Sequence, residues 1–260
     1  MGKLICFLSA LAFFAPIAHA ADLTPQQVRA ALETASPQQP ADLSGKDLSN
    51  LDLSKLDFKG ANLSKANLFG ANLTSSDFSK ANLSGANLDA AWLMKANFSG
   101  ANLTKASLFG PVIYPSLQIT PGDRPNFTNA NFTDARIIAR FNQLNLQGAN
   151  FSNARMGVDL KNQPMGQMRN DFSSTNLSGV DFSGADVNRA LFAFADLKNA
   201  NLTNANLFRA DLTNADLTGA NLTGANLAEA DLNGAILKNV KGLDQVKGWD
   251  QAKNKEKAVM

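Results

Sequence analysis

The sequence predicts an all-β fold, a four-sided solenoid with a short helical cap at each end. The first observation is a five-residue unit, written seven times without a break over residues 200–234. A period of five is neither the 3.6 residues of an amphipathic helix nor the 2.0 of a plain strand. The second observation is that Phe takes the central position of the unit at Phe58, Phe78 and Phe98, twenty residues apart. Four units per coil would stack these rings along the axis, which is favourable.

Each unit is predicted to form one side of a coil and one corner. The small first residue and the central Leu or Phe are two positions apart, so both face inward from an extended backbone, while the Asn or Asp between them faces outward. Coils would then be joined by backbone hydrogen bonds at a spacing of about 4.8 Å. The Ala-Asn/Asp-Leu-x-x consensus over roughly residues 41–240 closely resembles the pentapeptide-repeat family. This resemblance implies a right-handed quadrilateral β-helix.

Residues 1–20 read as a secretory signal peptide. Lys3 precedes an apolar run from Leu4 to Ile17, and Ala18-His19-Ala20 fits the small-residue cleavage pattern. The alternative is an uncleaved anchor, but the apolar run is shorter than the ~20 residues that a spanning helix needs. We therefore expect export and cleavage, with no stable membrane insertion of the mature chain.

Residues 21–40 are expected to form an N-terminal capping helix. Thr24 suits the N-cap, Pro25 the first helical position, and Gln27 completes a capping box. An end helix of this kind would cover the open end of the solenoid. Pro37 and Pro40 stop it before the repeats begin.

The solenoid is predicted over residues 41–240, with two interruptions. Fourteen units precede a loop at 109–126, seven follow it, and fourteen more follow a second loop at 157–170. One step in the middle block is four residues long, from Ile137 to Phe141, which indicates a tightened corner or bulge. Residues 241–260 are predicted as a helical C-terminal cap with Trp249 over the last coil, followed by a disordered tail from residue 253.

The composition argues against catalysis. Cys6 and His19, the only Cys and His, both lie in the predicted signal peptide, so the mature chain would lack thiol, imidazole and Cys/His metal chemistry. Asp residues such as Asp211 and Asp216 take the outward position and interchange with Asn, which favours backbone hydrogen bonding over acid-base work. No cofactor, no metal and no enzyme activity are expected. The net charge of +2 is too small to indicate a nucleic-acid partner or a mimic of nucleic acid.

The middle of the chain is the predicted binding site. Residues 111–170 hold three acids against six bases. Counting units places Arg136 and Arg155 one coil apart on one side and Arg140 on the next, all in the position usually held by Asn or Asp. The two loops would bring four apolar or aromatic side chains to the same region. The predicted site comprises Arg136, Arg140, Arg155, Ile113, Tyr114, Met165 and Met168. Arg, Tyr and Met are typical of interfaces, although a solvated basic surface and tolerated insertions are the alternatives.

We call this predicted site in the middle of the chain the waist. The favoured function is an exported, non-catalytic binding or scaffold protein that presents the waist to a protein partner. Its compartment would be the periplasm, a thylakoid lumen or the extracellular space, and the sequence does not give the oligomeric state. A second hypothesis is an ice- or surface-binding solenoid, but the outward Thr ladder has only two rungs, Thr203 and Thr223. A third is a polysaccharide-acting enzyme that would rely on Asp with Arg or Lys.

Overall fold

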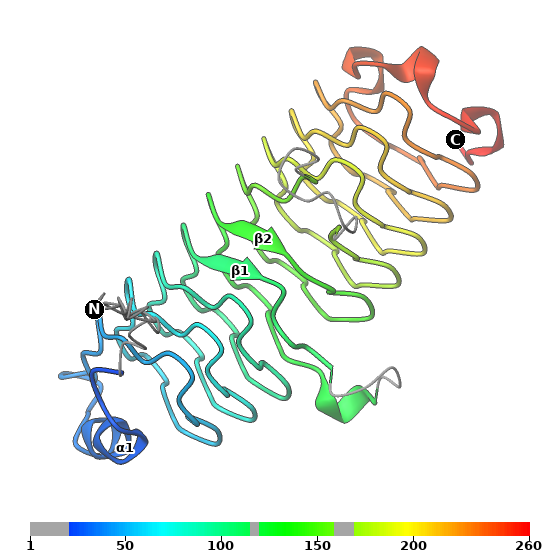
Figure 1. Ribbon diagram of the computed structural model, residues 1–260. Helices are drawn as coiled ribbons and strands as arrows, with labels where there is room; N and C mark the ends of the chain where they lie inside the picture. Colours follow the sequence, from blue (N-terminus) through cyan, green and yellow to red (C-terminus); the bar gives the residue numbers. More distant parts are fainter. Residues whose placement is uncertain (1–20, 115–119, 159–168) are drawn as a thin grey trace, which may run out of the picture.

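The computed structural model describes residues 21–114, 120–158 and 169–260. Figure 1 shows an elongated rod of stacked coils, with a helix at the N-terminal end and short turns at the C-terminal end. The helix is α1 (Pro25–Glu33), the strands are β1 (Ser107–Phe109) and β2 (Arg136–Ile138), and the 3-10 helices are η1 (Pro121–Asp123), η2 (Leu243–Gln245), η3 (Trp249–Gln251) and η4 (Lys255–Lys257).

Parallel backbone bridges join residues twenty positions apart throughout the regular repeats, 19, 29 or 31 positions apart around the two interruptions, and up to 23 apart in the last coil. Four rows of such bridges run along the rod, so the spacing of four units per coil is confirmed. We name the four sides after their outward residues in the first coil: Asp42 (side A), Asp47 (side B), Asp52 (side C) and Asp57 (side D). In the described part of the chain only β1 and β2 lengthen a bridge to three residues, with Ser107 opposite Arg136 on side B.

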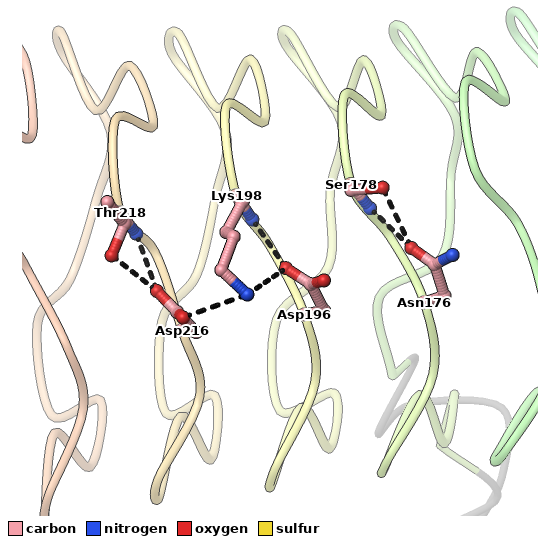
Figure 2. A network of polar contacts seen from close by, with 6 residues as sticks. All are labelled: Asn176, Ser178, Asp196, Lys198, Asp216 and Thr218. Atoms are coloured by element: carbon pink, nitrogen blue, oxygen red, sulfur yellow. Dashed lines mark hydrogen bonds and ion pairs between the residues drawn. The ribbon is translucent and has the colours of Figure 1, made fainter.

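The outward Asn or Asp holds the corner that follows it. Asp216 Oδ1 accepts a hydrogen bond from the backbone N–H of Thr218 at 3.0 Å (Figure 2). This local ring explains why Asn and Asp interchange at the position. An Asn adds a bond to the preceding coil, as when Asn72 Nδ2 donates to Asp52 Oδ1 at 3.0 Å.

Where two Asp residues are stacked on successive coils, a lysine can replace the missing amide donor. Lys198 Nζ lies 3.3 Å from Asp196 and 3.0 Å from Asp216 and bridges the two coils on side D (Figure 2). Burial opposes ionisation of Asp216, but hydrogen bonds from Thr218 and Lys198 outweigh it and lower the pKa of this carboxyl. The lysine thereby offsets the repulsion between like charges placed opposite one another.

The last residue of each unit turns the corner with a left-handed backbone. The φ angle is 69° at Gly85, 57° at Asn204 and 59° at Arg189. Gly and Asn adopt this region at low cost, whereas other residues pay some strain. A residue at this place projects its side chain from an edge of the rod, so the corner rows can carry charges.

The core is a single column of inward Leu, Phe and Ala side chains. Phe58, Phe78 and Phe98 stack with centroid distances of 4.5 and 4.9 Å and interplanar angles of 5°, as the spacing predicted. Phe172 and Phe192 form a second predicted pair at 5.1 Å. Each buried side chain of this size contributes roughly 1.5–3 kcal/mol relative to exposure, so the column is the main source of stability.

Helix α1 covers the N-terminal end of this column. The predicted capping box is present, since Gln27 N–H donates to the Thr24 side chain at 3.2 Å and Thr24 N–H donates to the Gln27 side chain at 2.7 Å. Val28 is fully buried, and Leu32 and Ala35 pack against the core. The helix thus removes apolar surface that the first coil would otherwise expose.

The first interruption begins later than predicted. Val112 bridges Trp92 on side C, and Ile113 is only 2% exposed, so residues 111–113 form one more regular side. The expected loop start at residue 109 was wrong because Pro111 occupies the place of the usual Ala. In a regular unit the N–H of this first residue donates within its own coil, as Ala106 N–H does to Leu103 O, and not to the neighbouring coil. A proline at this position therefore removes no hydrogen bond between coils.

The second interruption ends earlier than predicted, because Asn170 belongs to the core. It is fully buried in the place of an Ala, and its side chain forms three hydrogen bonds to the backbone. Nδ2 donates to Met156 O at 2.7 Å and to Ile137 O at 3.0 Å, while Oδ1 accepts from Ala139 N at 2.9 Å. Two irregularities meet here: the step of four residues from Ile137 to Phe141, and the second interruption, which follows Met156. The Asn170 side chain supplies the hydrogen bonds that backbone groups of a regular coil would otherwise make at this point.

The C-terminal end is not an α-helix. Residues 241–258 repeat every six positions, and Gly242 and Gly248 stand where the central Leu would be, with φ angles of 68° and 71°. Added Cβ atoms there would come within 2.6 Å of Thr223 Cα and 2.7 Å of Ala228 Cα, respectively. The apolar spacing of three suggested a helix, but a left-handed residue in every hexad excludes one.

The three hexads close the rod as a modified last coil. Leu243 and Trp249 pack against the core, as expected for a lid. The predicted disordered tail was wrong, since Lys253 bridges Asp231 and Val259 bridges Ile236. The chain is therefore held to the preceding coil almost to its end.

Candidate binding surface

Departures from Asn or Asp at the outward positions are concentrated on two neighbouring sides. Before the last coil, side A has none and side D has only Ile236. Sides B and C hold the other departures: Ser107, Arg136 and Arg155 on side B, and Trp92, Val112, Arg140 and Leu191 on side C. The substituting Arg, Trp, Val and Leu side chains cannot accept the corner hydrogen bond, so the fold gives no reason for them.

The register places Arg136 directly opposite Arg155, as the unit count predicted. Both side chains are exposed. The Arg136 guanidinium lies over the Phe109 ring at 5.7 Å, but neither arginine forms an ion pair with any described residue. Two stacked like charges are mildly destabilising, so this pair costs the fold a little free energy.

Arg140 lies on side C, opposite Asp171. It is exposed and has no ion pair within the residues that the structure describes. Beside it is a groove with a volume of about 420 Å³, whose lining combines charge with apolar surface: Gly110, Pro111, Ile138, Ala139, Arg140, Arg169, Asp171 and Leu191.

Tyr114 packs at the corner that follows side C. Its hydroxyl donates to Asn142 O, and burial raises its pKa to about 12. Arg124 Nη2 donates to Gln143 Oε1 at 2.9 Å and so ties the end of the first interruption to the same corner. Tyr114 therefore supports the waist, and its polar end is already occupied by the backbone.

Of the other predicted contributors that the structure describes, Ile113 does not join the arginines at the surface. Ile113 is a core residue and is not available to a partner. Met165 and Met168 lie outside the described residues. Among the residues that the structure describes, the predicted site thus consists of its three arginines, with Tyr114 beneath the neighbouring corner.

Sequence reasoning missed three arginines on the corner between sides B and C. Arg169, Arg189 and Arg209 are twenty residues apart and line one groove of about 320 Å³. Arg209 forms a two-point ion pair with Glu229, at 2.7 and 3.1 Å. The hydrogen bonds from Arg209 lower the pKa of the Glu229 carboxyl and raise that of the guanidinium. The signal was present in the sequence, because a spacing of twenty defines a row on a four-sided coil.

Together these residues form a surface that we call the arginine edge. It holds six of the eight arginines in the sequence: Arg136, Arg140, Arg155, Arg169, Arg189 and Arg209. The edge can bind anionic groups through guanidinium hydrogen bonds.

The rest of the described surface offers little for the competing hypotheses. In the parts of the chain that the structure describes, no group of three or more His, Cys, Asp or Glu could hold a metal ion, and no helix is long and apolar enough to cross a membrane. The Thr203 and Thr223 hydroxyls donate to their own Asn201 and Asn221 at 2.7 and 2.6 Å, so they are occupied within their own corners. Five carboxyl groups have a lowered pKa, which is the wrong direction for a general acid: Asp42, Asp52, Asp123, Asp216 and Glu229.

Comparison with known proteins gives a family and several solved structures. The family model for pentapeptide repeats matches in eight copies, over residues 41–70, 71–108, 171–207 and 205–241. The unmatched part between residues 108 and 171 contains Arg136, Arg140, Arg155 and Arg169. No curated protein sequence matches the chain.

Three similar structures are pentapeptide repeat proteins. HetL of the cyanobacterium Nostoc sp. strain PCC 7120, involved in the regulation of heterocyst differentiation, is 30% identical over 82% of this chain and 86% of its own, with a TM-score of 0.44. A protein of the Arabidopsis thaliana thylakoid lumen is 31% identical over 48% of this chain and 75% of its own, with a TM-score of 0.26. Rfr23 of the cyanobacterium Cyanothece 51142 is 25% identical over 46% of this chain and 90% of its own, with a TM-score of 0.29.

Proposed function

Since this chain belongs to the pentapeptide-repeat family, we propose that it is an exported, non-catalytic binding protein, a right-handed quadrilateral β-helix that presents its waist to an acidic protein partner. The rod supplies a rigid frame, because each coil is bonded to the next on its sides. Arg136, Arg140 and Arg155 supply the recognition, with Tyr114 holding the adjoining corner.

One observation carries this proposal. On side B, Arg136 and Arg155 replace the residue type that stabilises every coil of side A before the last, and they are stacked on one another without an ion pair in the described structure. The fold therefore loses two corner hydrogen bonds and gains a repulsion of up to about 1 kcal/mol. A partner that brings carboxylates to the pair would reverse that cost.

Export rests on residues 1–20, whose basic start, apolar run and Ala18-His19-Ala20 ending fit a secretory signal. The compartment would be the periplasm, a thylakoid lumen or the extracellular space. A non-catalytic role is supported by the outward Asp residues, whose carboxylates accept the backbone N–H groups of the corners, as at Asp211 and Asp216.

The test is capture of partners from an envelope extract by the mature protein. A variant with Arg136, Arg140 and Arg155 all changed to Ser is compared with one in which Lys65, Lys80 and Lys105 are changed to Ser. Both lose three positive charges, but the lysines lie at corners outside the waist. We expect the arginine variant alone to lose the proteins that the parent captures, with unchanged circular dichroism. Equal capture by all three proteins would exclude the waist as the site.

A further inference from the structure

We propose that the part of the arginine edge formed by Arg140, Arg169 and Arg189 is a linear groove for an extended acidic segment of a protein, with carboxylates on these three arginines and an apolar side chain beside Leu191. This inference rests on the proposed binding function and names the class of ligand. It also moves the centre of the site from side B to side C and its corner.

The first support is continuity. The groove of about 420 Å³ beside Arg140 and the groove of about 320 Å³ beside Arg189 share Arg169 in their linings. Arg140 and Asp211 are separated by three bridge steps on side C, from Arg140 to Asp171, to Leu191 and to Asp211. At about 4.8 Å per coil this is roughly 14 Å, which four or five residues of extended chain would span.

The second support is the state of the charges. Arg209 at the end of the row is paired with Glu229, whereas Arg140, Arg169 and Arg189 have no ion pair with any residue that the structure describes.

The neighbouring carboxylates are partly committed to the fold. Asp171, Asp211 and Asp231 each accept a backbone N–H from the residue two positions on, at 2.9, 3.0 and 3.0 Å. Glu229, which lines the same groove, is paired with Arg209. Arg140, Arg169 and Arg189, which form no ion pair with a described residue, are therefore the groups best able to take a carboxylate as a bidentate pair.

The third support is the apolar part of the lining, which favours a protein segment over a uniform polyanion. Leu191 occupies an outward position on side C where Asn or Asp would close the corner, and it lies in the groove with Pro111 and Ile138. The phosphates of a nucleic acid or the sulfates of a polysaccharide would gain no contact from Leu191 at this position. A peptide that alternates acidic and apolar residues would place both kinds of side chain.

The test uses a labelled peptide of about eight residues with alternating Glu and Leu, and fluorescence anisotropy at low and physiological salt. The key variants are Arg169→Ser with Arg189→Ser, and Leu191→Asn. The second restores the residue type of the ladder, so it should fold at least as well as the parent. Lys65→Ser with Lys105→Ser is the control of equal charge loss, on the corner between sides A and B instead of the corner between sides B and C.

We expect the double arginine variant to bind the peptide at least tenfold more weakly, Leu191→Asn about three- to tenfold more weakly, and the lysine control unchanged. An alternating Lys and Leu peptide should not bind. The inference is overturned if the Glu-Leu peptide fails to bind the parent at millimolar concentration, or if the lysine control loses as much affinity as the arginine variant. Tighter binding of duplex DNA or heparin, unaffected by Leu191→Asn, would instead assign the edge to a polyanion.

These outcomes are separable from those of the proposed function. The waist variant leaves Arg169, Arg189 and Leu191 unchanged. One possible result is therefore that the waist variant loses partner capture while the Arg169 and Arg189 substitutions leave peptide binding unchanged. That combination would keep the waist and refute the linear groove.

Discussion

Replacing Asn170 by Ala should destabilise the rod far more than the loss of any outward Asn. Its side chain is fully buried and satisfies three backbone groups: the N–H of Ala139 and the carbonyls of Ile137 and Met156. Each buried polar group left without a partner costs about 1–3 kcal/mol. Allowing for partial rehydration, we expect a loss of about 3–5 kcal/mol.

The matched control is Asn201→Ala on side A. Asn201 also bonds through both ends of its amide, to Asp181 at 3.0 Å and from the Thr203 N–H at 3.2 Å, but it is only partly buried. Water can replace both partners, so we expect a cost of about 0.5–1 kcal/mol. Asn170→Leu separates hydrogen bonding from packing, because it fills the space without restoring a single polar contact.

Hydrogen exchange is the suitable assay, because a solenoid can open locally and a single unfolding transition need not report on one coil. The amide of Ala139 should exchange about a hundredfold faster or more in Asn170→Ala, at 1.4 kcal/mol per tenfold. Asn170→Leu should show the same acceleration. This role of Asn170 is contradicted if Asn170→Leu restores the parent exchange rate of the Ala139 amide, or if Asn170→Ala lowers stability no more than Asn201→Ala. Either result would show that the hydrogen bonds of Asn170 to the backbone do not stabilise the coil.

Three further predictions address the core, the waist and export. Tyr114 is the only tyrosine, so its ultraviolet titration should report a pKa of about 12 in the folded protein, against about 10 in denaturant. Since the pKa of Tyr114 is raised on folding, its contribution to the free energy of unfolding is complete below about pH 10 and is lost as the pH rises toward about 12. A titration midpoint near 10 in the folded protein would show that Tyr114 is not buried at its corner. Leu63→Asp should cost several kcal/mol, because it buries an unpaired carboxylate, whereas Asn62→Ser should cost at most about 1 kcal/mol, and similar melting temperatures for the two would reverse the assignment of inward and outward positions. Intact-mass measurement of exported protein should show Ala21 as the first residue, and retention of residues 1–20 would point to an anchored form.

The regular part of the fold could be read from the sequence because one geometry repeats. Counting four units per coil was enough to stack Phe58 on Phe78 and to place Arg136 opposite Arg155. The same count would have found Arg169 and Arg189 as neighbours in a corner row. A regional sum of charge does not reveal such a row, because residues twenty positions apart share an edge while their neighbours in sequence lie on other sides.

The irregular parts could not be read in this way. The repeat pattern has a small first residue, a place that Pro111 takes here, so the pattern predicts a loop there although residues 111–113 form a regular side with Ile113 in the core. Asn170 bonds to Ile137 across 33 positions, and no repeat relates the two. The hexads at the end carry an apolar spacing of three, which matches a helical turn, and only the left-handed conformation of Gly242 and Gly248 shows that the chain turns otherwise.

The two interruptions preserve the rotational phase of the rod. The first leaves after side C at Ile113 and returns on side D at Asn126, and the second leaves after side B at Met156 and returns on side C at Asp171. Each therefore resumes at the side that would have come next. Deletion of one five-residue unit between Arg140 and the second interruption would keep the inward pattern yet turn everything downstream by a quarter, which would carry Arg169, Arg189 and Arg209 away from Arg140. An insertion between units therefore leaves the arginine edge intact only when the chain resumes on the side that would have come next. Whole coils of twenty residues can be gained or lost at either end without changing the arginine edge.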